Sequence, residues 1–190
     1  DYITDENGYI EINRVYIDSN QKQGKHDNID NFFKENGVEI IRKRLEMGDY
    51  LLDLQNFAVC VDTKSGWDEV GQNLFGKKDK VRFENTLQKA EAAKIPLIIL
   101  VETDMPLEKW RNPRHTYNYQ DIHNHIYMLE DKYQYVHFIV CSPKSTPNIL
   151  LGFLTDTFLY DDEKIEQVYQ EQEKWAAEIK AAESTQQIKS

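Results

Sequence analysis

Long apolar runs are missing from this sequence of 190 residues, in which hydrophobic residues make up 40% and charged residues 29%. No stretch approaches the roughly 18 consecutive apolar residues that a membrane span requires, so we expect no membrane partner. The chain also opens on acidic and polar residues, which lack the basic and then apolar pattern of a signal peptide. We therefore expect a globular protein of the cell interior.

Cysteine is scarce, with two residues in the chain. Cys60 and Cys141 each lie inside an apolar run typical of a strand, so we interpret both as buried thiols. A disulfide is disfavoured because such bonds are rare in reducing compartments. Four histidines raise the question of zinc: His115, His123, His125 and His137. No cysteine has a suitable spacing, and His123 and His125 face different sides of a predicted helix, which disfavours a zinc site.

Positive charge is in deficit, because 23 basic residues face 33 acidic residues and the net charge is −10. This balance weakens a nucleic-acid interpretation, since attraction to phosphates dominates that kind of affinity. The deficit is unevenly distributed: residues 14–94 hold 14 basic and 14 acidic residues, and the remainder holds 9 and 19. A bound cation would offset part of the acidic charge in the first half. Nucleic-acid binding by that half therefore stays a hypothesis.

Apolar periodicity predicts alternating strands and helices. The expected strands span residues 15–18, 38–45, 50–54, 57–61, 95–101 and 136–141. The expected helices are one that ends before Gly37, one long helix or broken pair over 67–93 with weak points at Gly71 and Gly76, and helices over 119–132 and 148–157. This order predicts an α/β domain with a mixed central sheet flanked by helices. No glycine-rich loop joins a strand to a helix, so P-loop and Rossmann folds have no support.

The predicted elements and the charge distribution divide the chain into four parts. We expect an N-terminal extension over 1–13, one domain over 14–158, an appended charged helix over 159–182 and a disordered tail over 183–190. The appended helix has a thin apolar stripe, which either packs on the domain or forms a self-association surface. Its members are Ile165, Val168, Trp175 and Ile179.

Two acids and a lysine form the most informative pattern. Asp62 and Lys64 are two residues apart on a predicted strand, so both project from one face, and a short hairpin brings Asp49 beside them. Facing carboxylates repel each other unless a hard cation such as Mg²⁺ or Mn²⁺ lies between them. A metal held this way polarises a phosphate ester and activates water, while a lysine orients that water or neutralises developing charge. We predict Asp49, Asp62 and Lys64 as catalytic residues, with both acids as metal ligands.

Further residues extend this predicted site. We count Asp18 and Asp68 as additional metal ligands, with a solvated strand end and stabilisation of a helix N-terminus as the respective alternatives. A group of basic residues is predicted to contact phosphates, with a solvated helix face as the alternative. Its members are Lys22, Lys25, Lys77, Lys78, Lys80 and Arg82.

These residues resemble the signature of the nuclease domain of the XPF family of structure-selective endonucleases, which reads GD, a variable hairpin, ERK, three residues and D. Here the corresponding runs are Gly48-Asp49 and, from Asp62 to Asp68, DTKSGWD. The similarity extends over roughly 14–157. It implies a restriction-endonuclease-like, PD-(D/E)xK fold and a Mg²⁺- or Mn²⁺-dependent endodeoxyribonuclease that cuts branched or flapped DNA in repair or recombination. It also implies a homodimer or a hetero-partner, and a place in the cytoplasm at the nucleoid, or in the nucleus of a eukaryote.

The sequence departs from the family pattern at several positions. The glutamate and arginine of ERK are Asp62 and Thr63, and the D-x-R-E opening is Asp18-Ser19-Asn20-Gln21. The helix-hairpin-helix modules that bind DNA in the family are missing from these 190 residues. Two alternatives follow: a catalytically silent DNA-binding or scaffolding subunit on the same fold, and an interaction protein that engages another protein through its acidic surface.

Overall fold

The computed structural model describes residues 3–4, 10–11, 14–21, 27–54 and 57–155. The chain divides into two units, Asp1–Thr155 and Asp156–Ser190, and all described residues belong to the first. The predicted helix over 159–182, the predicted tail and the predicted phosphate contacts Lys22 and Lys25 lie outside the described residues.

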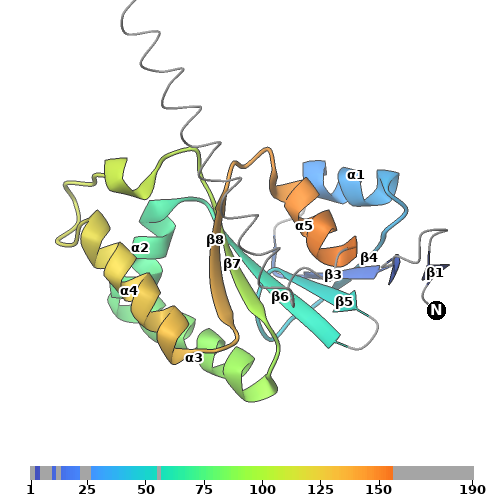
Figure 1. The fold of residues 1–190 in the computed structure, drawn as a ribbon, viewed down its shortest axis with the longest axis horizontal. Coiled ribbons are helices and arrows are strands. Elements are labelled where there is room, and N and C mark those ends of the chain that lie inside the picture. The colour runs from blue at the N-terminus through green and yellow to red at the C-terminus, as the bar shows by residue number, and fades with distance from the viewer. Residues whose placement is uncertain (1–2, 5–9, 12–13, 22–26, 55–56, 156–190) are drawn as a thin grey trace, which may run out of the picture. The chain divides into compact units, whose positions relative to one another are not determined.

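A six-stranded mixed sheet forms the centre of the first unit, in the order β4-β3-β5-β6-β7-β8 (Figure 1). The strands are β3 (Arg14–Asp18), β4 (Glu39–Lys43), β5 (Tyr50–Leu54), β6 (Phe57–Lys64), β7 (Leu97–Glu102) and β8 (Val136–Cys141). β5 runs antiparallel to both of its neighbours, β3 and β6, whereas β3–β4, β6–β7 and β7–β8 are parallel pairs. β1 (Ile3–Thr4) and β2 (Ile10–Glu11) form a separate antiparallel pair. The mixed sheet confirms the predicted fold class.

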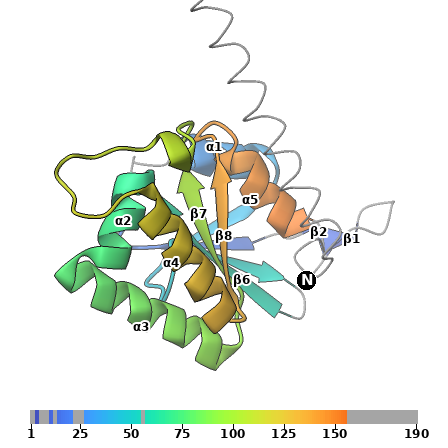
Figure 2. The same ribbon diagram turned by 60° about the vertical axis from the view of Figure 1, so that its left-hand side comes forward.

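Helices cover the sheet on both sides. Helices α2 (Trp67–Phe75), α3 (Lys77–Ala93) and α4 (Tyr119–Lys132) lie on one face, and α1 (Asp27–Glu35) and α5 (Thr146–Thr155) lie on the other (Figure 2). This layering explains why β7 is apolar from Leu97 to Val101, since both faces of a covered parallel strand are buried. Leu97, Ile99 and Val101 join the core under α2–α4, and the alternate residues Ile98 and Leu100 are equally buried on the opposite side.

The predicted long helix is a broken pair, and the break lies at Gly76. Gly76 has an extended backbone and ends α2 where α3 begins, and an added Cβ there would lie 2.6 Å from the carbonyl oxygen of Gln72. Gly71, the other predicted weak point, stays inside α2 and is buried. An added Cβ at Gly71 would lie 2.5 Å from the ring of Tyr117. Gly71 therefore makes room for a neighbouring segment instead of breaking the helix.

The two cysteines are buried, as their apolar surroundings predict: Cys60 and Cys141 are free thiols.

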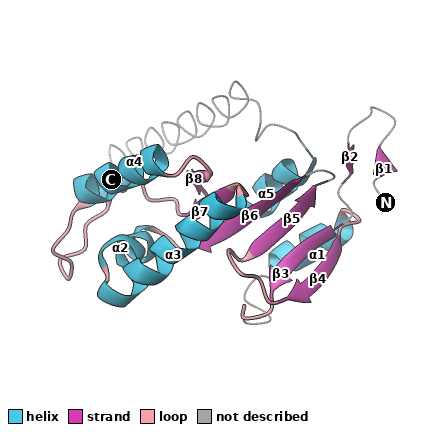
Figure 3. Ribbon diagram, turned by 90° about the horizontal axis from the view of Figure 1, so that it is seen from below, coloured by secondary structure: helices cyan, strands magenta, loops and turns pink. Residues whose placement is uncertain are grey.

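None of the described helices combines the length and the apolar composition that crossing a bilayer requires. Strands β3, β4 and β5 lie side by side beyond α3 when the sheet is seen from below (Figure 3). Of the predicted site residues, Asp18, Asp49, Asp62, Lys64 and Arg82 line one hollow that α3 and these strands share.

Candidate active site

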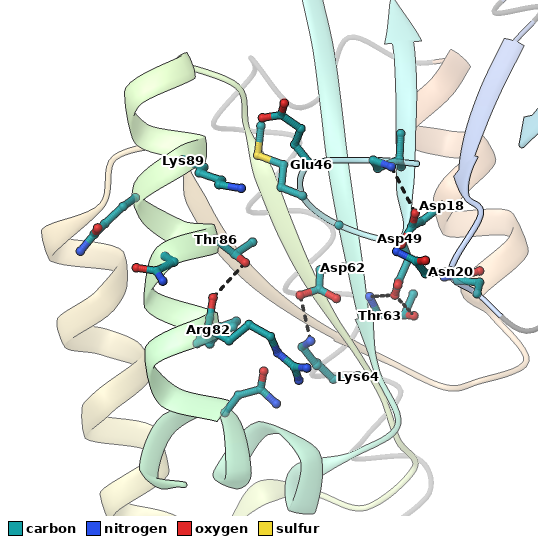
Figure 4. A pocket seen from close by; sticks show the side chains of 18 of the residues that line it. Asp18, Asn20, Glu46, Asp49, Asp62, Thr63, Lys64, Arg82, Thr86 and Lys89 are labelled. Carbon is teal, nitrogen blue, oxygen red and sulfur yellow. Dashed lines mark hydrogen bonds and ion pairs between the residues drawn. The ribbon is translucent and has the colours of Figure 1, made fainter. Parts of the chain in front are cut away.

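Asp62 and Lys64 lie at the end of β6, on the face that α2–α4 cover. Cys60, two residues before Asp62, belongs to the core on that face, and residues two apart in a strand share a side. The Lys64 Nζ lies 2.8 Å from Asp62 Oδ2, and the two side chains are 9% and 15% exposed. Figure 4 shows the pair facing α3. The spacing of two residues places both side chains on one face, where they form a shielded ion pair that the sequence analysis did not predict.

Asp49 lies beside this pair because of the register between β5 and β6. Tyr50 is opposite Val61, so Asp49 comes opposite Asp62, and its N–H donates to the Val61 carbonyl at 2.7 Å. Asp49 Oδ2 accepts hydrogen bonds from the Thr63 N–H at 2.9 Å and the Thr63 hydroxyl at 2.6 Å. Since β5 begins at Tyr50, the carboxylate takes the place of a strand partner for Thr63. The sequence prediction missed this role of Thr63.

Asp18 completes a row of three acids across adjacent strands. Ile17 is opposite Tyr50, and the Asp18 N–H donates to the Asp49 carbonyl at 2.9 Å. Asp18 Oδ1 accepts a hydrogen bond from the Leu45 N–H at 3.1 Å. This hydrogen bond directs the carboxylate toward the segment after β4, so Asp18 supports the turn before Gly48. Asp18 also lines an open hollow in the surface, together with Asp49 and Asp62.

Gly48 has a conformation that other residues rarely adopt. Its φ is +72°, and an added Cβ would lie 2.8 Å from the Val61 carbonyl oxygen. Glycine alone adopts this backbone without strain and permits so close an approach to β6. The Gly-Asp pair is therefore a structural unit, in which Gly48 makes the turn that sets Asp49 against β6.

The electrostatic environment of Asp62 favours its protonated form. Burial is the largest cause and raises the pKa of Asp62 to about 6, with smaller contributions from Lys64, which lowers it, and Asp49, which raises it. The influence of Asp49 shows that the two carboxylates interact. An added cation between them would relieve both the burial cost and the repulsion.

Asp68, a predicted metal ligand, is turned away from this centre. Its Oδ1 accepts a hydrogen bond from Asn112 Nδ2 at 2.6 Å and lies 3.6 Å from His115 Nε2. The next residue, Glu69, faces the centre instead: its Oε1 is 3.9 Å from Lys64 Nζ. Successive residues point about 100° apart around a helix, so the choice between them depends on how α2 packs.

An open hollow of about 1320 Å³ surrounds these residues, with the strand ends on one side and α3 on the other (Figure 4). Its α3 wall includes Arg82, Asn85, Thr86 and Lys89, which recur at spacings of three and four residues on one helix face. Sequence reasoning predicted Arg82 as a phosphate contact and missed Lys89, although this spacing connects the two.

The other predicted basic contacts on α3 do not line this hollow. Lys77 and Lys78 are exposed, and they are absent from its wall. Lys80 is absent from the wall as well, and its charge, after burial of the ring, lowers the pKa of His125 on α4. The structure therefore brings one of the four predicted basic residues of α3, Arg82, to the acids.

Asp49 and Asp62 are the residues of this site that could hold a divalent cation. Among the described residues, neither Asp49 Oδ1 nor Asp62 Oδ1 accepts a hydrogen bond. Mg²⁺ is commonly held by one or two protein carboxylates and completes its coordination with water and substrate. In the described part of the chain, no group of three or more His, Cys, Asp or Glu side chains is arranged to hold an ion. The predicted set of four acidic ligands, Asp18, Asp49, Asp62 and Asp68, is thus not assembled as one metal cluster, and a cation held by Asp49 and Asp62 with water remains a proposal.

Comparisons with known proteins bear on the fold. No protein-family model matches the sequence, and no curated protein matches it. Among solved structures, the fold is similar to XPF from Aeropyrum pernix, with a TM-score of 0.56 and 20% identity over 74% of this chain and 63% of that chain. The chain thus spans less than two thirds of that neighbour. At this identity the likeness concerns the fold, which is restriction-endonuclease-like and similar to that of XPF.

Proposed function

We propose that the protein is a Mg²⁺- or Mn²⁺-dependent endonuclease that hydrolyses DNA phosphodiester bonds. The observation that carries the proposal is the meeting of Asp49, Asp62 and Lys64 at the ends of two neighbouring strands, inside an open polar hollow. Two adjacent acids with one lysine on a common sheet face match the needs of metal-assisted phosphoryl chemistry. The restriction-endonuclease-like fold supports this choice.

Each residue of the centre has a distinct task in this proposal. Asp49 and Asp62 hold the cation, which when bound supplies Lewis acidity toward the phosphate and lowers the pKa of water. The Lys64 ammonium donates hydrogen bonds to the phosphoryl oxygens as their negative charge grows. Glu69 lies near the same ammonium, with 3.9 Å between Glu69 Oε1 and Lys64 Nζ, and Lys64 Nζ also lies 5.7 Å from the centre of the Phe83 ring. These contacts would hold the lysine in place if Asp62 bound a cation.

The opposite wall suits a polyanionic chain. Arg82 and Lys89 lie seven residues apart on α3, a separation of about 10 Å along a helix. Two cations at that separation suit phosphates along a strand better than one compact ligand. The volume of about 1320 Å³ also exceeds the roughly 300–1,000 Å³ of small-molecule pockets.

The resemblance of the Gly48–Asp68 region to the XPF family adds three further parts to the proposal. The substrate is branched or flapped DNA, the partner is a second copy or a different subunit, and the location is the nucleoid or the nucleus.

Cleavage of labelled flap, fork, Holliday-junction and single-stranded DNA, with and without Mn²⁺, tests the activity. We expect metal-dependent cutting that falls at least 100-fold in Asp62→Asn and Lys64→Ala, with Lys34→Ala on α1 as the control. Undiminished cutting by both site variants would overturn the assignment.

A catalytically silent DNA-binding subunit is the second candidate. Two observations favour it. Asp-Thr-Lys replaces the family's Glu-Arg-Lys, and Lys64 Nζ pairs directly with Asp62 Oδ2 at 2.8 Å, so the lysine would compete with a cation for this carboxylate. Calorimetric titration with Mn²⁺ discriminates between the two functions. Heat that disappears in Asp62→Asn supports the enzyme, whereas no binding together with retained DNA affinity supports the silent subunit.

A further inference from the structure

The segment between β7 and α4 is held against α2 by stacked rings. The rings of Trp110 and Tyr117 lie 5.9 Å apart at 9°, and those of His115 and Tyr117 lie 4.6 Å apart at 17°. Phe75, at the end of α2, stacks on Tyr117 at 4.5 Å. Gly71 leaves the space that the Tyr117 ring fills. The stack thus fixes a loop of 16 residues, 103–118, which contains only one short 3-10 turn, η1 (Leu107–Lys109).

Hydrogen bonds add to this anchoring. The Trp67 indole N–H donates to the Met105 carbonyl at 2.7 Å. Asn112 joins the loop to the first turn of α2: its Nδ2 donates to Asp68 at 2.6 Å, and its Oδ1 accepts from the Arg114 N–H at 3.0 Å. The backbone of Arg114 therefore has a fixed position beside the N-terminal end of α2.

A second hollow, of about 660 Å³, opens between this loop, α2 and α3. Its lining comprises Asp68, Glu69, Gln72, Asn73, Asp79, Arg82, Asn112, Arg114 and His115. Glu69, Asn73 and Arg82 also line the hollow at the candidate active site. The two hollows are therefore neighbours that share a wall, with Arg82 between them.

The carboxylates in the second hollow are all engaged by local donors. Asp68 accepts from Asn112 at 2.6 Å, and Glu69 accepts from the Ser65 N–H at 2.8 Å and the Ser65 hydroxyl at 2.9 Å. Asp79 pairs with Arg82 at 3.2 Å. In the part of the chain that the structure describes, no carboxylate lies within ion-pair distance of the Arg114 guanidinium. Arg114 is thus an exposed cation on a held backbone, and it has no counter-charge within the described residues.

From these contacts we infer that the second hollow is a phosphate-binding subsite for the nucleic-acid strand that crosses the candidate active site, with Arg114 as its principal contact. This inference rests on the proposed function, because it takes the strand as the ligand of the first hollow. A guanidinium suits the recognition of phosphate oxygens, to which it donates two hydrogen bonds in a plane. His115 and Arg82 supply further donors. The shared wall lets one strand contact both hollows and sets the strand's direction along α2 and α3.

Methylphosphonate substitution of single phosphates tests the inference. Fluorescence anisotropy of labelled flap DNA, with one phosphate neutralised at a time and Ca²⁺ to prevent cutting, measures affinity for wild type and Arg114→Ala. We expect one phosphate, away from the scissile one, whose neutralisation weakens wild-type binding about tenfold and leaves Arg114→Ala binding unchanged. The salt slope of Arg114→Ala should also fall by about one.

Two controls separate the possible failures. Lys34→Ala removes one positive charge from α1, on the other face of the sheet, and should keep the wild-type phosphate profile. Near-ultraviolet circular dichroism of the ring stack verifies that Arg114→Ala keeps its loop. If the wild type and Arg114→Ala bind DNA with the same dependence on each phosphate, the subsite is overturned and the proposed nuclease activity is unaffected. Binding with the expected profile but without cutting in Mn²⁺ would support the subsite and overturn the nuclease activity. No binding by wild type at low salt would overturn both.

Discussion

Asp49 receives two hydrogen bonds from Thr63 through a single carboxylate oxygen, at 2.9 Å from the N–H and 2.6 Å from the hydroxyl. The strand that holds Asp62 thus also orients the acid on its neighbour. Asp49 Oδ2 thus accepts both hydrogen bonds, and Oδ1 accepts none from the described residues, so Oδ1 is the atom that our proposal assigns to the cation. Thr63 is a positioning residue in this view, since it acts through Asp49.

Thr63→Val should weaken the candidate metal site without dismantling it. The variant loses the hydroxyl bond and keeps the N–H bond, so we expect a loss of about 1 kcal/mol in the free energy of unfolding. The less restrained Asp49 should weaken Mn²⁺ binding severalfold in calorimetric titration. Thr63→Ser keeps the hydroxyl and should retain wild-type affinity. Equal Mn²⁺ affinity in the valine and serine variants would argue against this role.

Asp62→Asn should stabilise the metal-free protein at pH 8. The pKa of Asp62 is raised to about 6, so the folded state binds its proton more tightly than the unfolded state does. Stability from this group is therefore fully present below pH 4 and is lost as the pH rises through 6. The loss amounts to about 3 kcal/mol at pH 8, and asparagine avoids it.

Thermal unfolding in EDTA at pH 4, 6 and 8 measures the effect. The difference between Asp62→Asn and wild type should be largest at pH 8 and close to zero at pH 4. Asp131→Asn, at an exposed position on α4, should show no such trend. An asparagine variant that is less stable than wild type at pH 8 would contradict the assigned cost of burial.

Two glycines with nearly equal φ provide a matched test of the turn before Asp49. Gly48 has φ +72° and a Cβ position 2.8 Å from the Val61 oxygen, whereas Gly37 has φ +73° and nothing within 4 Å. Gly37→Ala should lower the free energy of unfolding by about 1 kcal/mol, because alanine is strained in the left-handed backbone conformation and meets no neighbour there. Gly48→Ala adds a clash with β6 and should cost at least about 2 kcal/mol more. Urea unfolding of both variants compares the costs, and equal values would disprove the steric argument.

Lys89 should contribute to DNA binding more than Lys80 does. Lys89 lines the hollow beside the acids, whereas Lys80 does not. Fluorescence anisotropy at several salt concentrations should give Lys89→Ala a salt slope lower by about one, because one phosphate contact is lost. Lys80→Ala should bind as wild type does. The reverse order would indicate that DNA follows the α3–α4 surface instead.

Several elements followed from local pattern alone. α4 (Tyr119–Lys132) and β8 (Val136–Cys141) have the predicted bounds. A capping box of Asn118 and Asp121 begins α4, and a short apolar run in which only His137 is exposed defines β8. Such signals act over a few residues, and no tertiary contact changes the ends of these two elements, so the sequence predicts them correctly. The shared face of Asp62 and Lys64 followed from the strand period in the same way.

By itself, the sequence determined the strands and helices, the mixed α/β class, and the common face of Asp62 and Lys64, because strand and helix periods are local properties. Tertiary structure decided which neighbouring acid faces Lys64, Asp68 or Glu69, because the rotation of α2 depends on its packing. It also decided that Lys89 joins Arg82 at the hollow, and that Gly71 receives the ring of Tyr117. Those outcomes depend on contacts between segments distant along the chain, which periodicity does not encode.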